Sequence, residues 1–292
     1  MNTEKIHRYR RPSTIPALPN IKNIIAVGSG KGGVGKSTVA ANLALALLQT
    51  GARVGLLDAD IYGPSQPLIL GAKQEAPSSH DQKSINPVIC HGLQTMSIGY
   101  LVDQKTAMIW RGPMVSGALQ QLLNDTRWDT LDYLIIDLPP GTGDIQLTMA
   151  QKIPVSGAVI VTTPQDLSLL DARRAIAMFN KVNIPVLGVI ENMSTYHCPA
   201  CGHIDAIFGD LIGDSGGTTM AAETGTLLLG QLPLTKQIRV DTDHGTPTVI
   251  ADPEGSIAKA YQEIAKKMMA QLSLQPRDYS SKLPKVTTVF GS

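Results

Sequence analysis

The stretch of sequence that decides the fold is Gly28-Ser29-Gly30-Lys31-Gly32-Gly33-Val34-Gly35-Lys36-Ser37-Thr38. From Gly30 to Ser37 it matches the pattern G-x-x-x-x-G-K-[ST], in which a glycine-rich loop joins a strand to a helix. The preceding residues 23–28 are short and apolar, as expected of a buried strand, and the alanine- and leucine-rich run 37–50 predicts a helix that ends before Gly51. In this setting the pattern predicts a phosphate-binding loop.

The residue types of this loop suit an anion. Glycines free the backbone so that successive N–H groups can surround a phosphate, and the helix that follows presents the positive end of its dipole. Lys36 is expected to place its charge on the β- and γ-phosphates, and the Ser37 hydroxyl to bind Mg²⁺. The whole stretch 28–38 is therefore predicted to bind ATP, with Lys36 also serving catalysis.

Outside the loop, short apolar runs alternate with helical patterns. We interpret 53–57, 133–136, 158–162, 186–190 and 227–229 as strands, and 144–152, 167–182 and 216–224 as helices. Strands without polar alternation, separated by helices, predict an α/β fold with a mostly parallel sheet covered by helices on both faces. We expect a single domain of the P-loop NTPase class over 22–272, after a flexible arm at 1–21 and before a loose tail at 273–292.

Two regions give weaker signals. Residues 60–130 are rich in Gly, Pro and Ser, and they predict a long excursion with a hairpin near 88–98 and a helix near 114–124. The last helix is expected over 256–272, where Tyr261, Ile264 and Met268 lie on one stripe. Such a stripe is typical of a helix docked on a core.

Carboxylates follow two of the predicted strands. Asp58 and Asp60 follow 53–57, and Asp137 follows 133–136. Because the carboxyl ends of parallel strands face the same crevice as the loop, we expect these side chains at the nucleotide. Asp137 is interpreted as the carboxylate that holds Mg²⁺ through water, and Asp58 as one that ties the loop together. Residues 139–143 are typical of a loop that senses the γ-phosphate, and Asp144 is expected to cap the next helix.

The composition excludes several function classes. The 292-residue chain is 43% hydrophobic and 17% charged, which suits a large buried core. A net charge of +1 and 4% aromatic residues argue against a nucleic-acid partner. No membrane partner is expected, since no apolar segment approaches the ~20 residues that span a bilayer and the charged start is not a secretory signal. Three cysteines, an odd number, favour a reduced, cytoplasmic compartment.

Two of the cysteines form the pair Cys198-Pro199-Ala200-Cys201. A single C-x-x-C can be a redox dithiol, half of a zinc site, half of an iron–sulfur site or a chance match. A redox dithiol normally lies near the start of a βαβ unit, which this position does not fit. Two thiolates leave a metal half-coordinated, and a two-fold dimer would supply four, which suit an iron–sulfur cluster or Zn²⁺. His197 and His203 flank the pair but are not expected to be ligands, and Cys90 is expected to be buried.

Several motifs together resemble one family. The loop G-K-G-G-V-G-K-S-T resembles the deviant Walker A loop of dimeric ATPases. It is accompanied by L-D-A-D-I-Y-G-P-S from Leu57, D-L-P-P-G-T-G-D from Asp137, E-N-M-S from Glu191 and C-P-A-C-G from Cys198. Over residues 21–272 the chain resembles the Mrp/ApbC-type iron–sulfur cluster carriers, relatives of the septum-site-determining and partitioning ATPases.

The resemblance implies an ATP-hydrolysing homodimer. It implies a labile, dimer-bridging [4Fe–4S] cluster on Cys198 and Cys201, handed to apo iron–sulfur proteins with ATP turnover coupled to the exchange. It also implies that Lys31 reaches the partner's nucleotide, that Asp60 orients the attacking water and that Asn192 hydrogen-bonds adenine. Some members carry a separate domain before the ATPase, whose task we expect to be absent or supplied in trans, since only 21 residues precede the domain here.

Alternative functions share the ATP site. A spatial-positioning ATPase would not need the cysteine pair, and it usually needs a membrane-binding helix or a DNA-binding patch, neither of which the tail 275–292 offers. A structural zinc clamp would keep the ATPase and place Zn²⁺ on the pair. Nitrogenase-type reductases take their two cysteines per chain from distant positions, so the close spacing of Cys198 and Cys201 counts against that class.

Overall fold

The computed structural model describes residues 6–9, 18–79, 81, 83–102, 112–209 and 216–278. Its strands are β1 (Ile21–Gly28), β2 (Val54–Asp58), β3 (Val88–Cys90), β4 (Leu93–Ser97), β5 (Leu131–Asp137), β6 (Gly157–Thr162), β7 (Val186–His197), β8 (Ile204–Asp205) and β9 (Leu228–Leu234). Its α-helices are α1 (Lys36–Gln49), α2 (Gln66–Ile69), α3 (Gly112–Asp125), α4 (Asp144–Lys152), α5 (Asp166–Lys181), α6 (Gly216–Glu223), α7 (Lys236–Asp243), α8 (Thr248–Ala251) and α9 (Ser256–Ser273).

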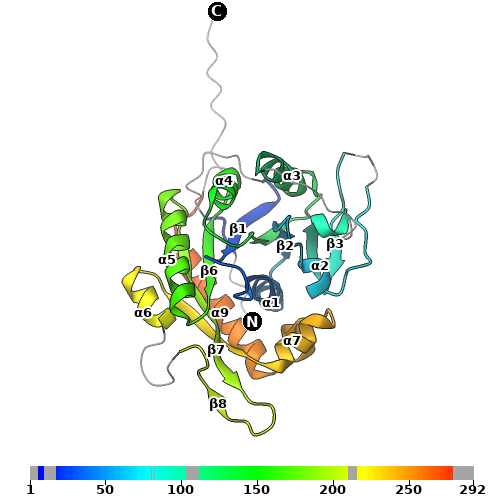
Figure 1. Cartoon of the computed structure of the whole chain (residues 1–292). Coiled ribbons are helices and arrows are strands. Elements are labelled where there is room, and N and C mark those ends of the chain that lie inside the picture. Colours follow the sequence, from blue (N-terminus) through cyan, green and yellow to red (C-terminus); the bar gives the residue numbers. More distant parts are fainter. Residues whose placement is uncertain are drawn as a thin grey trace, which may run out of the picture.

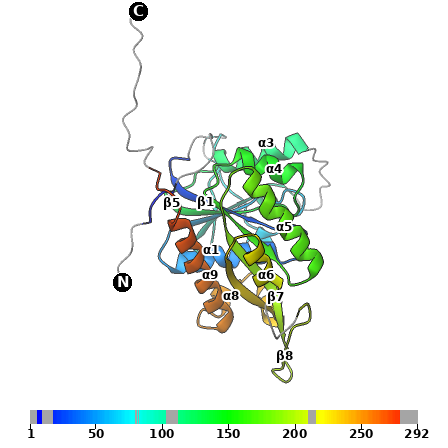
Figure 2. The ribbon, with the colours of Figure 1, turned by 90° about the vertical axis from the view of Figure 1, so that its left-hand side faces the viewer.

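The described strands form one sheet with helices on both faces (Figures 1 and 2). Its order is β3-β4-β2-β5-β1-β6-β7, and both β8 and β9 pair with β7. The pairings are parallel except β3 with β4 and β7 with β8. The predicted α/β class with a mostly parallel sheet is therefore confirmed.

The central strands are buried on both faces, which explains their unbroken apolar runs. In β1, Ile25 and Val27 pack into the core on the side of α1 and α9, while Ile24 and Ala26 pack into the core on the side of α3, α4 and α5. Helix α9 lies over α1 with Tyr261 and the rest of its apolar stripe buried. Strand β1 thus sits in the middle of the sheet, and the predicted phosphate loop follows its carboxyl end.

The irregular region 60–130 contributes more to the sheet than its sequence indicates. The predicted hairpin is present as β3 and β4, but β4 also pairs in parallel with β2 and extends the sheet. The strand Leu93–Ser97 mixes polar and apolar residues, so its pattern gives no sign of a buried parallel strand. The part of this excursion at 103–111 lies outside the described residues.

Strand β7 is longer than predicted. Its apolar half ends near Ile190, where the prediction stopped, but the backbone remains extended to His197 and pairs with β9 and β8. The last residues are polar and half-buried because they leave the body of the sheet and form a projecting hairpin (Figure 1). The hairpin carries the cysteine pair at its turn.

The ends of the described chain contact each other. Tyr9 pairs with Arg277 in an isolated β-bridge, and its N–H donates to Asn23 Oδ1 at 3.1 Å. This contact between the predicted arm and the predicted tail was not expected from the sequence; residues 1–5, 10–17 and 279–292 of these segments lie outside the described residues. Among the helices that the structure describes, none has both the length and the apolar character needed to cross a membrane.

Candidate nucleotide and thiol sites

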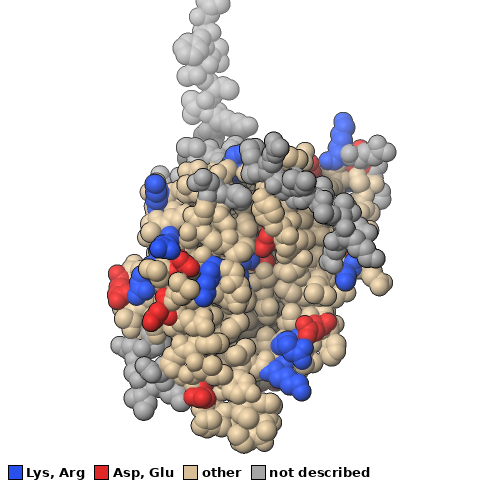
Figure 3. All heavy atoms as spheres, in the orientation of Figure 1, with Lys and Arg blue, Asp and Glu red and all other residues tan. Residues whose placement is uncertain are grey.

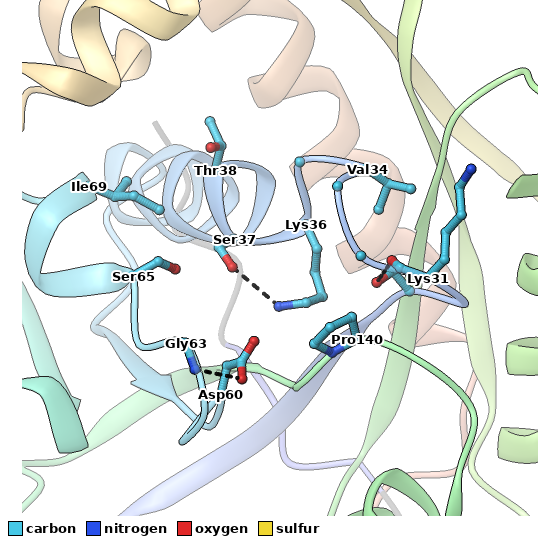
Figure 4. Close-up of a pocket in the computed structure, with 14 residues that line it drawn as sticks. Lys31, Val34, Lys36, Ser37, Thr38, Asp60, Gly63, Ser65, Ile69 and Pro140 are labelled. Carbon is cyan, nitrogen blue, oxygen red and sulfur yellow. Dashed lines mark hydrogen bonds between the residues drawn. The ribbon is translucent and has the colours of Figure 1, made fainter. Parts of the chain in front are cut away.

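The predicted phosphate loop joins β1 to α1 and lines an open cavity of about 340 Å³ (Figure 4). All residues from Ser29 to Thr38 except Gly30 line it, together with Asp60, Gly63, Ser65, Ile69 and Pro140. Gly33 and Gly35 have φ angles of +82° and +80°, which side-chain-bearing residues rarely adopt. The loop therefore has the backbone freedom and the position that binding of a phosphate chain requires.

The two glycines of the stretch that do not line the cavity permit close packing beneath it. A Cβ at Gly28 would lie 3.2 Å from the Phe179 ring, and a Cβ at Gly30 would lie 2.2 Å from the backbone carbonyl of Asp171 in α5. Gly28 and Gly30 thus allow the loop to lie close against α5, and neither lines the cavity.

Replacing Gly30 with alanine should damage both stability and nucleotide binding. The new methyl group would meet backbone, which cannot rotate away, so we expect a loss of about 1–3 kcal/mol in the free energy of unfolding. Thermal unfolding with and without ADP would measure this. Gly117→Ala in α3 is the matched control, since its Cβ would meet no atom within 4 Å and alanine favours a helix. Equal melting temperatures for Gly30→Ala and the parent would contradict the close approach.

Lys36, Ser37 and Asp137 meet at the floor of the cavity. The Lys36 ammonium contacts Asp137 Oδ1 and donates to Ser37 Oγ at 3.2 Å. Lys36 is 6% exposed and Asp137 is fully buried, so this is a buried ion pair. A cation thus lies between the hydroxyl and the carboxylate predicted to hold Mg²⁺, and such hard oxygens are the groups that Mg²⁺ prefers.

Two further carboxylates lie at the carboxyl end of β2. Asp58 is fully buried and accepts hydrogen bonds from the N–H groups of Asp60, Ser65 and Gln66 at 3.0–3.1 Å. Burial, followed by the charge of neighbouring Asp137, raises the pKa of Asp58 to about 7. Asp58 ties the loop after β2 in place, as the sequence indicated.

Asp60 faces the cavity from the same loop (Figure 4). Its carboxylate points toward Lys36 and accepts a hydrogen bond from Gly63 N at 3.2 Å. Burial raises the pKa of Asp60, while the Lys36 charge lowers it. A carboxylate at this place can accept a hydrogen bond from water at a terminal phosphate.

Lys31 extends differently from Lys36. Figure 4 shows its ammonium directed away from Lys36 and from the floor of the cavity. Its Nζ lies 3.5 Å from Gln165 Oε1, at the start of α5. One lysine of the loop therefore points into the cavity, and the other lies along its edge.

The predicted sensor loop 139–143 lies against the phosphate loop. Gly141 N–H donates to Ser29 O at 3.0 Å, and Pro140 lines the cavity. Helix α4 begins at Asp144 with Gly143 in the capping position, so the prediction that Asp144 is the cap is wrong by one residue. Gly143 takes the extended conformation of a cap without supplying a side chain.

Asn192, on the extended part of β7, packs under the loop. Its Nδ2 donates to Val34 O at 2.9 Å, and a Cβ at Gly35 would lie 2.3 Å from that nitrogen. Asn192 is 8% exposed and does not line the phosphate cavity. The structure thus gives it a contact that the sequence did not indicate, and the adenine contact stays a prediction.

The cysteine pair lies in the turn between β7 and β8. Cys198 N–H donates to His203 O, and Gly202 N–H donates to Cys198 O, both at 2.9 Å. Hydrogen bonds from the backbone N–H groups of Cys201 and Ala200 lower the pKa of the Cys198 thiol, which favours the thiolate. Cys201 is exposed, whereas Cys90 is buried as expected.

The hairpin that carries the pair has an apolar, nearly uncharged surface. Asp205 is the one Asp, Glu, Lys or Arg residue between 196 and 209, and Ile204 and Ile207 are 47% and 52% exposed. The projecting tip shows no Lys or Arg in Figure 3. No group of three or more His, Cys, Asp or Glu residues suited to a metal ion occurs within the described ranges. In the described part of one chain, the two thiols therefore do not belong to a larger group of such residues.

Sequence reasoning missed several residues of the cavity. Gly63, Ser65 and Ile69 line it. Gln66 donates hydrogen bonds from its amide to Ser37 and Asp137. A signal was present for Ser65, because it ends the motif that starts at Leu57. Gln66 and Ile69 belong to α2, a single helical turn without a recognisable pattern.

The sheet order, the loop on the central strand and the acidic end of the adjacent strand β5 define a P-loop NTPase. Residues 20–269 match the ParA family model described as NUBPL iron-transfer P-loop NTPase. The chain belongs to this family.

Comparison with individual proteins agrees with this family assignment. An iron–sulfur cluster carrier protein of Pseudomonas fragi is 58% identical over 258 residues, which cover 88% of each chain. A nucleotide-binding protein from Archaeoglobus fulgidus in complex with ADP is 35% identical with a TM-score of 0.70, over 83% of this chain and 93% of that chain. The septum site-determining protein MinD of Pyrococcus horikoshii, with Mg-ADP, shares the fold at 22% identity and a TM-score of 0.60, over 84% and 95% of the two chains.

Proposed function

We propose that this chain binds and hydrolyses ATP with Mg²⁺ and carries an iron–sulfur cluster, as cargo, on Cys198 and Cys201. We further propose that it acts in the cytoplasm as a homodimer and delivers the cluster to apo iron–sulfur proteins. The carrying observation is a pair of thiols in a hydrogen-bonded turn that directly follows the strand whose Asn192 contacts the phosphate loop. The name and 58% identity of the Pseudomonas fragi relative support the same function.

The ATPase chemistry follows from the groups at the cavity floor. Bound Mg²⁺ would add positive charge next to the phosphate oxygens, held by Ser37 directly and by Asp137 through water. The Lys36 ammonium, which contacts Asp137 at the cavity floor, can contact the β- and γ-phosphates when the nucleotide enters. Asp60, which also lines the cavity, would orient water toward the γ-phosphate.

The thiol pair suits a cluster shared between two chains. A four-iron cluster takes four thiolates, and one hairpin offers two. The low charge and exposed isoleucines of the hairpin favour contact with a second copy, which would bring two pairs together around a two-fold axis. The predicted domain limits, with arm 1–21 and tail 273–292 outside the ATPase, remain part of this proposal.

Anaerobic purification followed by metal analysis tests whether the chain carries an iron–sulfur cluster. We expect iron and acid-labile sulfide in equal amounts, a broad visible absorption, and a dimer by light scattering when the cluster is bound. Zinc without sulfide would instead indicate a structural clamp. Sedimentation with liposomes or DNA that depends on ATP would favour a positioning ATPase.

The Lys31→Ala variant should lose ATP hydrolysis while retaining most of its affinity for ATP. Because the Lys31 ammonium points away from its own cavity floor, we expect it to act on the partner's nucleotide. A cation of this kind can contribute about 10³-fold in rate. Steady-state hydrolysis and equilibrium ATP binding measure the two effects.

A mixing experiment identifies the subunit in which Lys31 acts. In a mixed dimer of Lys31→Ala and Lys36→Ala chains, action across the interface leaves one complete site. Random mixing should then restore about a quarter of the parent's rate, because half the dimers are mixed and each has one site. Action within one subunit predicts no restoration.

A further inference from the structure

Two buried oxygen atoms beside the phosphate cavity have no hydrogen-bond partner within the described part of the chain. They are Ser65 Oγ and Gln66 Oε1. Native proteins pair nearly all such atoms, because a buried polar atom without a partner loses the hydrogen bonds that water would give it. Two unpaired oxygens on consecutive residues, next to the predicted Mg²⁺ ligand, indicate that their donors arrive with a ligand.

The orientation of the Gln66 amide is set by its neighbours. Its Nε2 donates to Asp137 Oδ2 at 2.8 Å and to the backbone carbonyl of Ser37 at 3.0 Å. Both neighbours are acceptors, so the amide nitrogen must face them and both of its hydrogens are used. Gln66 is 1% exposed, and its oxygen is therefore left buried without a donor.

Ser65 is held in a similar way. Its N–H and that of Gln66 each donate to Asp58 Oδ2 at 3.0 Å, which fixes the backbone of both residues. Ser65 lines the cavity, and Figure 4 shows its hydroxyl pointing toward Ser37. The Ser65 oxygen thus points toward one residue expected to hold Mg²⁺, and the Gln66 amide contacts both Ser37 and Asp137.

We propose that Ser65 and Gln66 are positioning residues for Mg²⁺, and that their free oxygens accept hydrogen bonds from the water molecules that the ion retains. Mg²⁺ in nucleotide sites keeps several waters, and each has two hydrogens to donate. Neutral oxygens outside the ion's own ligands are known to tune metal affinity. This inference rests on the proposed nucleotide site and adds two residues to it.

The test uses Ser65→Ala, which removes one free oxygen and no hydrogen bond made by the hydroxyl in the described structure. Binding of a fluorescent ADP analogue (mant-ADP) is titrated with Mg²⁺ and repeated in EDTA, and melting is followed without nucleotide. We expect the half-saturating Mg²⁺ concentration to rise about tenfold. Binding in EDTA should be unchanged, and the melting temperature should stay equal or rise, because an unpaired buried hydroxyl is lost.

A second variant and a control separate this role from a structural one. Gln66→Met should raise the Mg²⁺ requirement as well, but with a lower melting temperature, because the Nε2 contacts are also lost. Ser156→Ala is the matched control: its buried Oγ accepts the Ile24 N–H at 3.2 Å, so the variant should melt earlier and keep the parent's Mg²⁺ requirement.

An unchanged Mg²⁺ requirement in Ser65→Ala would overturn the inference, and so would an equal loss of affinity with and without Mg²⁺. If the parent itself binds mant-ADP no better with Mg²⁺ than in EDTA, the proposed nucleotide site fails, and the variants are not needed to show it. The two failures are therefore distinguishable.

Discussion

The Lys36→Ala variant should lose ATP hydrolysis by roughly 10²–10³-fold, because the only cation contacting Asp137 in the described structure is also the charge expected on the transferring phosphate. It should also melt earlier in the absence of nucleotide. Asp137 is fully buried beside Asp58, and removal of one partner of a buried ion pair costs about 3–5 kcal/mol. Steady-state phosphate release and thermal unfolding measure the two losses.

Two further variants keep this prediction testable. Lys36→Met retains the aliphatic stem, so it should fold even if Lys36→Ala fails to fold. It should show the same loss of ATP turnover. Lys266→Ala is the control, since the exposed Lys266 pairs with Glu263 on the surface of α9 and should change neither quantity. Undiminished hydrolysis in both Lys36 variants would contradict the site described above.

The Cys198→Ala variant should fail to assemble a cluster. In a dimer it removes two of four thiolates, and it removes the thiol whose pKa the backbone of the turn lowers. After anaerobic reconstitution with iron and sulfide, we expect less than about a tenth of the parent's iron and sulfide per chain. ATP hydrolysis without cluster should be retained, since the turn contributes no residue to the phosphate cavity.

Cys90→Ala is the matched control for the cysteine assignment. Cys90 is 6% exposed, and its sulfur lies 3.7 Å and 3.8 Å from the hydroxyls of Thr95 and Tyr100, inside the core. This variant should keep the cluster and lose some stability. If Cys198→Ala instead holds as much cluster as the parent, the thiol pair is not the cargo site.

The connection between the two sites is a feature of strand β7. Asn192 contacts the phosphate loop at Val34, and Cys198 follows six residues later, at most about 20 Å along an extended chain. Between them Met193 has a φ of +57°, where the strand changes register against β9. The thiol turn is therefore joined to the nucleotide site by one short piece of backbone.

The local features of this protein were predictable from its sequence. The phosphate loop is identifiable because its chemistry lies in consecutive residues, and β1, β5 and β6 are identifiable because burial on both faces removes polar residues from them. The parallel pairing of β4 with β2 was not predicted, because β4 is buried but its pattern mixes polar and apolar residues. The outer half of β7 was missed because it is only partly buried and its residues are mostly polar.

By itself the sequence determined the fold class, the phosphate loop, the acidic strand ends and the thiol pair, since each depends on a short stretch or on a repeating pattern. Only the tertiary structure decided which residues meet around the cavity. Gln66 reaches Ser37 and Asp137 across 29 and 71 positions of the chain, and Asn192 reaches Val34 across 158. Such contacts arise from the order in which strands pair, and no spacing within the sequence records that order.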